Sequence, residues 1–327
     1  MATPVKETTT GRSGDGERRR KDFRLLVSPS PRRLIISLPV LFALTFSLCL
    51  PLAETSSALA QSRQGRRQEA HSKPLESFTP ANHALVDRAI AAACLERQRD
   101  PFGSAPIDEM QARPSLPVGH PDAVAGARRA ERLLPEAKKL VVTSLIQLAH
   151  EYRIYENSSR LRTAIARVQQ VTRVKPDMEA RDNASVFLKD PHTIHFGTIF
   201  LAGLRSDESV LSVLAHELTH IADGQSDTLH ALFRAIGKRA AGRTDLHIEG
   251  QRAEELSCDL VGALATRSFI QRTPSWEPVS RRLARALEHN CVSEDEGDEE
   301  HLSPRNTIRA LFTLDLSLAN NLLSNRF

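Results

Sequence analysis

The segment from 206 to 221 constrains this chain most, because its pattern predicts a buried helix that carries two histidines. Ser206 is a favourable N-cap, and acids occupy the next two positions, where the positive end of the helix dipole stabilises them. Apolar residues fill most of positions 210 to 214, so we expect this helix to lie in the core. The motif His216-Glu217-Leu218-Thr219-His220 follows directly.

Histidines four residues apart project from one face of a helix and can bind a single metal ion. Glu217 would point about 100° round the helix from His216, within reach of a water in a fourth coordination position. A buried face with two histidines and a glutamate needs compensation, and Zn²⁺ would provide it. The alternative is a pair of hydrogen-bonded core histidines that bind no metal.

A hydrolytic zinc site needs a third protein ligand, which we expect downstream of the motif. The residues directly after His220 lack the glycine and histidine of the metzincin extension, so a more distant helix must supply it. Glu255 and Asp259 lie four apart in the helical pattern from 250 to 269. Glu255 could bind the ion while Asp259 accepts a hydrogen bond from a ligating imidazole. Glu254 is an alternative third ligand, one residue out of phase with Asp259.

These features occur in an order that resembles a known family, the CAAX-prenyl-endopeptidase-like zinc peptidases. That family includes the membrane protease HtpX and periplasmic barrel-assembly proteases. The resemblance runs from about Asn183 to Leu264, and Cys258 stands where the family usually has alanine. It rests on Asn183-Ala184 before a strand, a strand that ends at Gly197, the acidic helix start Asp207-Glu208, Val213-Leu214-Ala215 before the motif, and Glu255 with Asp259.

The resemblance implies a mainly helical α+β fold, the zincin arrangement of a motif helix packed against a small β-sheet. It also implies a zinc endopeptidase in which Glu217 is the general base, and a protein or peptide substrate that extends along the strand ending at Gly197. No transmembrane helix flanks the motif and no tetratricopeptide array follows it, so neither a lipidated substrate nor barrel assembly is implied. The alternative is a non-catalytic, zinc-stabilised binding or envelope-assembly domain.

The mechanism also needs a group that stabilises the developing oxyanion. His247, His289 and His301 are the candidates, each of which could instead be a solvated surface histidine. His192 and His195 are out of phase on their strand, which argues against a second metal site there. The acidic run from 294 to 300 lacks the alternating ligands of a calcium loop and is better read as a solvated loop.

The N-terminal residues predict export. Arg32-Arg33 precede the apolar run from 34 to 52, and small residues follow as far as Ala60, as in a secretory signal peptide. An uncleaved inner-membrane anchor is the alternative, since the run has nearly spanning length. Residues 1 to 60 also hold nine basic and five acidic residues, an excess equal to the net charge of +4 of the whole chain. The remainder is neutral, so nucleic-acid binding is not suggested, and we expect a periplasmic or secreted protein.

We therefore expect three regions: a leader or signal peptide (1 to 60), a flexible and Pro-rich segment with one helix (61 to 121), and a zinc metallopeptidase domain (122 to 327). Two short strands, from 184 to 188 and from 192 to 197, are the only β-structure predicted. Helices are expected at 82 to 97, 122 to 133, 135 to 157, 159 to 171, 206 to 221, 224 to 237, 250 to 269, 277 to 289 and 304 to 323.

Three cysteines remain once the leader is removed, so at least one must be unpaired in an oxidising compartment. Cys258 is the expected free thiol, because it lies within the helix that carries Glu255. Cys94 and Cys291 then form the expected disulfide.

Overall fold

The computed structural model describes residues 78–99, 112–181, 183–187, 189–287 and 297–324. The chain divides into two compact units, 1–67 and 68–327, and every described residue belongs to the second. The predictions of a leader and of a cleavage site at Ala60 therefore lie outside the described residues. Within the described part of the chain, no helix combines the length and the apolar character that a membrane span requires.

The second unit is mainly helical with one small sheet, which confirms the α+β class predicted from the sequence. The helices are α1 (Pro80–Arg99), α3 (Pro121–Glu151), α4 (Ser159–Gln170), α5 (Thr198–Gly203), α6 (Asp207–Asp223), η1 (Gly224–Ser226), α7 (His230–Thr244), α8 (Gln251–Arg272), α9 (Val279–Leu287), α10 (Pro304–Leu314) and α11 (Leu316–Leu323). The strands are β1 (Arg173–Asp177), β2 (Ala184–Phe187) and β3 (Asp190–Gly197).

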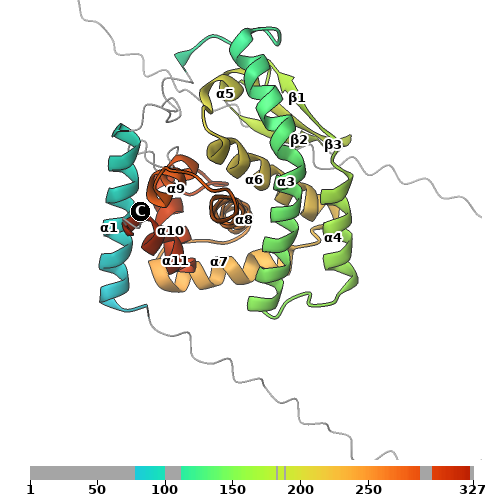
Figure 1. Cartoon of the computed structure of the whole chain (residues 1–327). Helices are drawn as coiled ribbons and strands as arrows, with labels where there is room; N and C mark the ends of the chain where they lie inside the picture. Colours follow the sequence, from blue (N-terminus) through green and yellow to red (C-terminus); the bar gives the residue numbers. More distant parts are fainter. Residues whose placement is uncertain (1–77, 100–111, 182, 188, 288–296, 325–327) are drawn as a thin grey trace, which may run out of the picture. The chain divides into compact units, whose positions relative to one another are not determined.

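Helix α8 forms the centre of the helical body. It contacts α3, α6, α7, α9 and α10, and Figure 1 shows it nearly end-on with these helices around it. Its residues 260 to 265 are all buried, as expected for a helix that is surrounded rather than amphipathic. Residues carried by α8 are therefore held from several sides.

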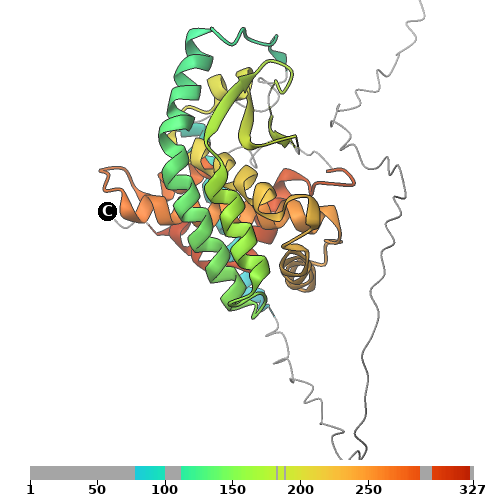
Figure 2. The same ribbon diagram turned by 90° about the vertical axis from the view of Figure 1, so that its right-hand side faces the viewer.

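The sheet has the order β1-β3-β2, with β1 parallel and β2 antiparallel to β3. Figure 2 shows the strands gathered at one end of the unit, beside the long helix α3. Both predicted strands are confirmed, but the prediction of no further β-structure was wrong. Strand β1 was not predicted because Pro176 and charged residues interrupt its apolar pattern. An edge strand tolerates such residues.

Pro135 does not separate two helices as the sequence predicted, because α3 runs without a break from Pro121 to Glu151. A proline within a helix removes one backbone hydrogen bond, but burial of the neighbouring turns can offset that cost. Leu133, Leu134 and Ala137 are all buried on either side of Pro135. Tertiary packing therefore overrides the local signal.

The C-terminal region also differs from the expected single helix, since Asp315 separates α10 from α11. The carboxylate of Asp315 accepts a hydrogen bond of 2.8 Å from the backbone N–H of Ser317 and so caps α11. Helix α7 begins at His230 rather than at Gly224, after the short turn η1. Residues 113 to 120 form neither helix nor strand, as predicted for the Pro-rich segment, of which 100 to 111 lie outside the described residues.

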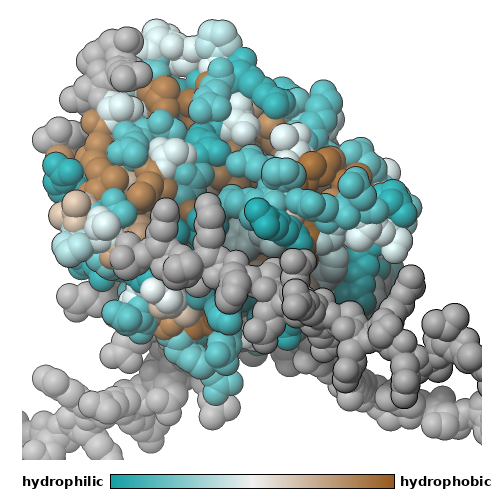
Figure 3. Space-filling view, turned by 90° about the horizontal axis from the view of Figure 1, so that it is seen from below, coloured by the Kyte–Doolittle hydropathy of each residue, from teal (hydrophilic) through white to brown (hydrophobic). Residues whose placement is uncertain are grey.

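One hydrophobic core runs through the described unit and includes residues from helices α1 to α11 and from all three strands. Phe196 of β3 and Phe312 of α10 are among its largest fully buried side chains. The face shown in Figure 3 is mainly hydrophilic, with hydrophobic areas interspersed.

Candidate metal centre

Helix α6 carries the predicted motif and is fixed at both ends. The Ser206 hydroxyl accepts a hydrogen bond of 3.1 Å from the backbone N–H of Ser209, which confirms the predicted N-cap. Gly224 ends the helix with a φ of 62°, and its N–H bonds to the carbonyl of His220. Val210, Leu211 and Leu214 before the motif are buried and Val213 is half-buried, so the two histidines extend from a helix packed in the core.

Helix α8 lies against α6 and brings Glu255 and Asp259 to the motif. The approach is close at Gly262, where an added Cβ would meet the backbone oxygen of Ser212 at 3.0 Å. Glycine at this position lets the two helices pack tightly enough for short polar side chains to meet.

Three ligand atoms converge between these helices. The Nε2 atoms of His216 and His220 lie 3.1 Å apart, and Oε2 of Glu255 lies 3.2 Å from the first and 3.4 Å from the second. All three atoms lie within 4.8 Å of one another, and among the described residues no other group of this kind could hold a metal ion. The structure thus brings together the three residues that the sequence singled out as ligands.

The opposite ring nitrogens face carboxylates of α8. His216 Nδ1 lies 2.9 Å from Oδ1 of Asp259, the contact expected from the sequence. His220 Nδ1 lies 3.2 Å from Oε1 of Glu254. Glu254 was considered as an alternative metal ligand, but its carboxylate meets the far side of the ring from Glu255.

Glu217, the expected general base, is only 6 % exposed. Burial raises the pKa of its carboxyl above the ordinary value, although the imidazoles of His216 and His220 partly oppose this rise. A carboxyl whose pKa moves toward neutrality is better suited to accept and return a proton.

Burial and the neighbouring charged groups act in opposite directions on the pKa values of the ligand cluster. Burial alone would lower the pKa of His216, but hydrogen bonds with Asp259 and Glu255 outweigh it and hold that pKa well above its usual value. Burial would also lower the pKa of His220, but Cys258 and Glu255 outweigh it and hold that pKa well above its usual value. Burial would raise the pKa of Glu255, yet the two imidazoles hold it well below the ordinary range. The cluster therefore favours an ionised carboxylate beside the two rings.

Of the three histidines considered for oxyanion stabilisation, His301 is the one brought to the cluster. Its Nε2 lies 3.8 Å from Oε2 of Glu255. His247 lies in the loop before α8 and, within the described part of the chain, has no hydrogen bond or ion pair with the cluster. His289 lies outside the described residues. Sequence spacing gave no means of choosing among the three.

A turn closed by the bridge between Gly297 and Leu302 presents His301. The carboxylate of Asp298 accepts hydrogen bonds from the backbone N–H groups of Glu300 and His301 at 2.8 and 2.6 Å, and lies 3.2 Å from His301 Nδ1. Arg252 of α8 donates its Nε–H to the carbonyl of Asp298 at 2.9 Å. The described part of the predicted acidic loop is thus a defined turn that fixes the His301 ring.

His195 belongs to a second polar cluster, on the sheet. Its Nδ1 lies 3.2 Å from Oδ2 of Asp177, its Nε2 lies 3.6 Å from Asp190, and Phe187 packs edge-on against its ring. His192 is exposed. That these two histidines form no second metal site stays a prediction.

The cysteines follow the prediction as far as they are described. Cys258 is a free, buried thiol. Cys94 is disulfide-bonded, and its partner lies outside the described residues, as does the predicted partner Cys291.

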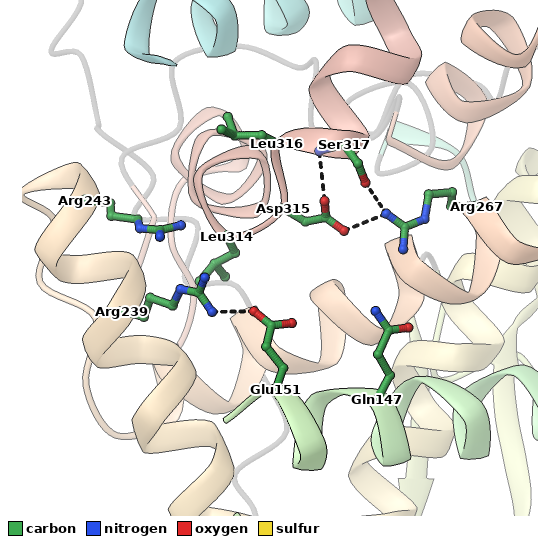
Figure 4. Close-up of a pocket in the computed structure, with 9 residues that line it drawn as sticks. All are labelled: Gln147, Glu151, Arg239, Arg243, Arg267, Leu314, Asp315, Leu316 and Ser317. Atoms are coloured by element: carbon green, nitrogen blue, oxygen red, sulfur yellow. Dashed lines mark hydrogen bonds and ion pairs between the residues drawn. The ribbon is translucent and has the colours of Figure 1, made fainter. Parts of the chain in front are cut away.

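A pocket of about 470 Å³ lies where α3, α7, α8 and the junction of α10 with α11 meet, and none of its lining residues belongs to the metal cluster. Arg239 bonds to Glu151, and Arg267 bonds to Asp315 at 2.6 Å and to Ser317 (Figure 4). Both guanidinium groups are thus paired within the protein, which is typical of a structural ion-pair network.

Comparison with known proteins adds no family assignment, because no protein-family model, curated protein or solved structure matches the chain.

Proposed function

We propose that this chain is a zinc-dependent endopeptidase with zinc on His216, His220 and Glu255. One observation carries the proposal: three potential ligand atoms, two from α6 and one from α8, lie within 4.8 Å of one another, and their residues were singled out by type and spacing. A three-ligand site of this composition leaves a fourth position for water and is typical of hydrolytic rather than structural zinc.

The donor set fits zinc. Two imidazole nitrogens and one carboxylate oxygen are the ligands of many catalytic zinc sites. Asp259 and Glu254 face the Nδ1 atoms of the two rings, so the Nε2 atoms are left to face the common point near Glu255. The two Nε2 atoms and the carboxylate oxygen, 3.1 to 3.4 Å from one another, would hold the ion.

The side chains then have separate tasks in peptide-bond hydrolysis. Zinc held by these residues would supply an activated water and a Lewis acid for the scissile carbonyl. Glu217 accepts the proton of the attacking water on its carboxylate and returns it to the leaving amine. His301, fixed by Asp298, faces the cluster and donates from Nε2 toward the developing oxyanion.

The resemblance suggested β3, which ends at Gly197, as the strand along which the substrate extends. In the structure β3 is the central strand, hydrogen-bonded to β1 on one side and to β2 on the other, so its edges cannot bind a peptide. Strand β2 contacts α6, and among the described residues no strand pairs with its outer edge. We therefore assign the substrate edge to β2 instead.

The zincin-like arrangement and the likeness to the CAAX-prenyl-endopeptidase-like family belong to the same proposal. So does export to the periplasm or the medium, with an uncleaved inner-membrane anchor as its alternative. The substrate is a protein or peptide, and no nucleic acid is involved. N-terminal sequencing of exported material tests the leader: residues before Gln61 would contradict cleavage after Ala60.

The decisive test compares zinc content and casein proteolysis in the purified full chain and in Glu217→Gln. We expect one zinc in both proteins and turnover in the wild type alone, because the substitution removes the base but no ligand. Glu249→Gln, a change at an exposed glutamate before α8, is the matched control and should behave as wild type. Full activity of Glu217→Gln would refute the assigned base. Bound zinc without turnover in any protein would favour the non-catalytic binding or envelope-assembly domain.

A further inference from the structure

Each histidine of α6 meets a carboxylate of α8 on the side of its ring that faces away from the converging ligand atoms. For His216 that carboxylate is Asp259, at 2.9 Å, and for His220 it is Glu254, at 3.2 Å. The sequence predicted the first contact and not the second. In both contacts a carboxylate oxygen lies within hydrogen-bond distance of Nδ1, although Glu254 belongs to no spacing pattern with the motif.

Glu254 and Glu255 are adjacent on α8, so their side chains leave the helix about 100° apart. His220 lies between them: its Nε2 is 3.4 Å from Glu255, and its Nδ1 is 3.2 Å from Glu254. Neighbouring glutamates thus contact opposite edges of one imidazole. This arrangement determines both the rotation of the ring and which nitrogen carries the proton.

We propose that Glu254 is a positioning residue for the metal site: it accepts the Nδ1–H of His220 and keeps the Nε2 lone pair directed at zinc. This inference rests on the proposed zinc site, which it deepens. Carboxylate partners of metal-bound histidines typically change metal affinity by about 10- to 100-fold. Helix α8 would then supply one ligand and both of the carboxylates that orient the histidines.

The buried thiol of Cys258 also interacts with His220 and is the competing partner for this ring. A neutral thiol is a weak acceptor, whereas a carboxylate forms a charge-assisted hydrogen bond, so Glu254 is the stronger partner. The Glu254 side chain is 36 % exposed. Its truncation therefore leaves no sealed cavity, and loss of the fold is not the expected result.

The test is zinc affinity, measured on the full chain by competition with a chromogenic chelator. Glu254→Ala should weaken binding by about 10-fold or more, because His220 loses its acceptor. Glu254→Gln retains an amide oxygen as acceptor and should stay within about threefold of the wild type. Glu249→Ala removes an exposed glutamate near the same helix end and is the control. The visible spectrum of bound Co²⁺ should shift in Glu254→Ala and not in Glu254→Gln.

Equal zinc affinity in the wild type and Glu254→Ala would overturn the inference while leaving the zinc site intact. Equal weakening in Glu254→Ala and Glu254→Gln would also overturn it, because charge rather than hydrogen-bond acceptance would then matter. If the wild type itself binds no zinc, the proposed function fails instead. Should Glu254→Ala not fold, Glu254→Asp tests the same contact: it keeps the charge but withdraws the carboxylate, and affinity as tight as in the wild type would refute the role.

Discussion

Asp223 carries a buried carboxylate one turn after His220 on α6. Its Oδ1 accepts a hydrogen bond of 2.5 Å from the backbone N–H of Leu229, which holds the turn between α6 and α7. Burial raises the pKa of Asp223 from 3.8 to about 6, and the nearby carboxylate of Glu254 adds to the rise. The ionised side chain therefore destabilises the folded state, although its hydrogen bond fixes this turn.

We expect Asp223→Asn to stabilise the metal-free protein at neutral pH. A carboxyl whose pKa is higher in the folded state destabilises it as pH rises from the unfolded value of 3.8 to about 6, and not below that range. Asparagine keeps the acceptor for Leu229 without the charge. The gain should be absent below pH 4 and reach roughly 1–2 kcal/mol above pH 6.5, after allowance for solvent screening. Urea denaturation across this range measures it, and a gain that does not vary with pH would contradict the assignment.

The proposed oxyanion role of His301 can be tested by substitution. His301→Ala should lower kcat by about 10²-fold, as removal of an oxyanion donor does elsewhere, with zinc content unchanged. Asp298→Ala should give a smaller loss, because the ring remains but is no longer fixed. Kinetics with a peptide substrate, with zinc quantified in each protein, check this. Glu299→Ala is the matched control, and full kcat in His301→Ala would remove the residue from the mechanism.

The packing of α8 on α6 brings the side chains of His216, His220 and Glu255 together. The close approach at Gly262 leaves 3.0 Å between an added Cβ and the backbone oxygen of Ser212. Gly262→Val should therefore destabilise the fold by about 1–3 kcal/mol and weaken zinc binding by separating the helices. Gly242 of α7 has no atom within 4 Å of an added Cβ, so Gly242→Val is the control and should change stability little. Thermal melts and zinc titration of both variants test this, and equal behaviour would contradict it.

Local patterns predicted most elements, because caps and periodicity act within a few residues. Ser206 marks the start of α6 in the sequence as it does in the structure. Pro135 led to the wrong prediction of a helix break. The residues on both sides of it pack against distant parts of the chain, and this packing keeps α3 continuous. Strand β1 was missed for the related reason that its identity depends on pairing with β3, twenty residues away.

Local spacing likewise predicted some residues of the candidate site, whereas others depend on tertiary contacts. His216 and His220 share a spacing that helical geometry converts directly into a common face, and Glu217 lies about 100° round the helix from His216. Glu255 and Asp259 were found because they repeat that spacing on a second helix. Glu254 and His301 carry no such mark: their places depend on how α8 meets α6 and on a turn that Arg252 holds. Such contacts are tertiary, so the sequence could name both residues as candidates but could not place them at the cluster.

The two described cysteines differ in oxidation state. Cys94 is disulfide-bonded and lies on α1, which contacts α9, α10 and α11. Disulfides persist mainly in oxidising compartments, and export to such a compartment stays a proposal. Cys258 is free and buried within α8, out of reach of exchange in the folded state.

We expect reduction to lower the stability of the folded unit by about 2–4 kcal/mol, because the unfolded chain loses its cross-link. Denaturant midpoints should be compared with and without a phosphine reductant, since thiol reductants bind zinc. The midpoint of Cys94→Ser under oxidising conditions should equal that of the reduced wild type and should not change when the reductant is added. Cys258→Ala, the control, should respond to reduction as the wild type does. A wild-type midpoint that does not change on reduction would mean that the bond contributes nothing to stability.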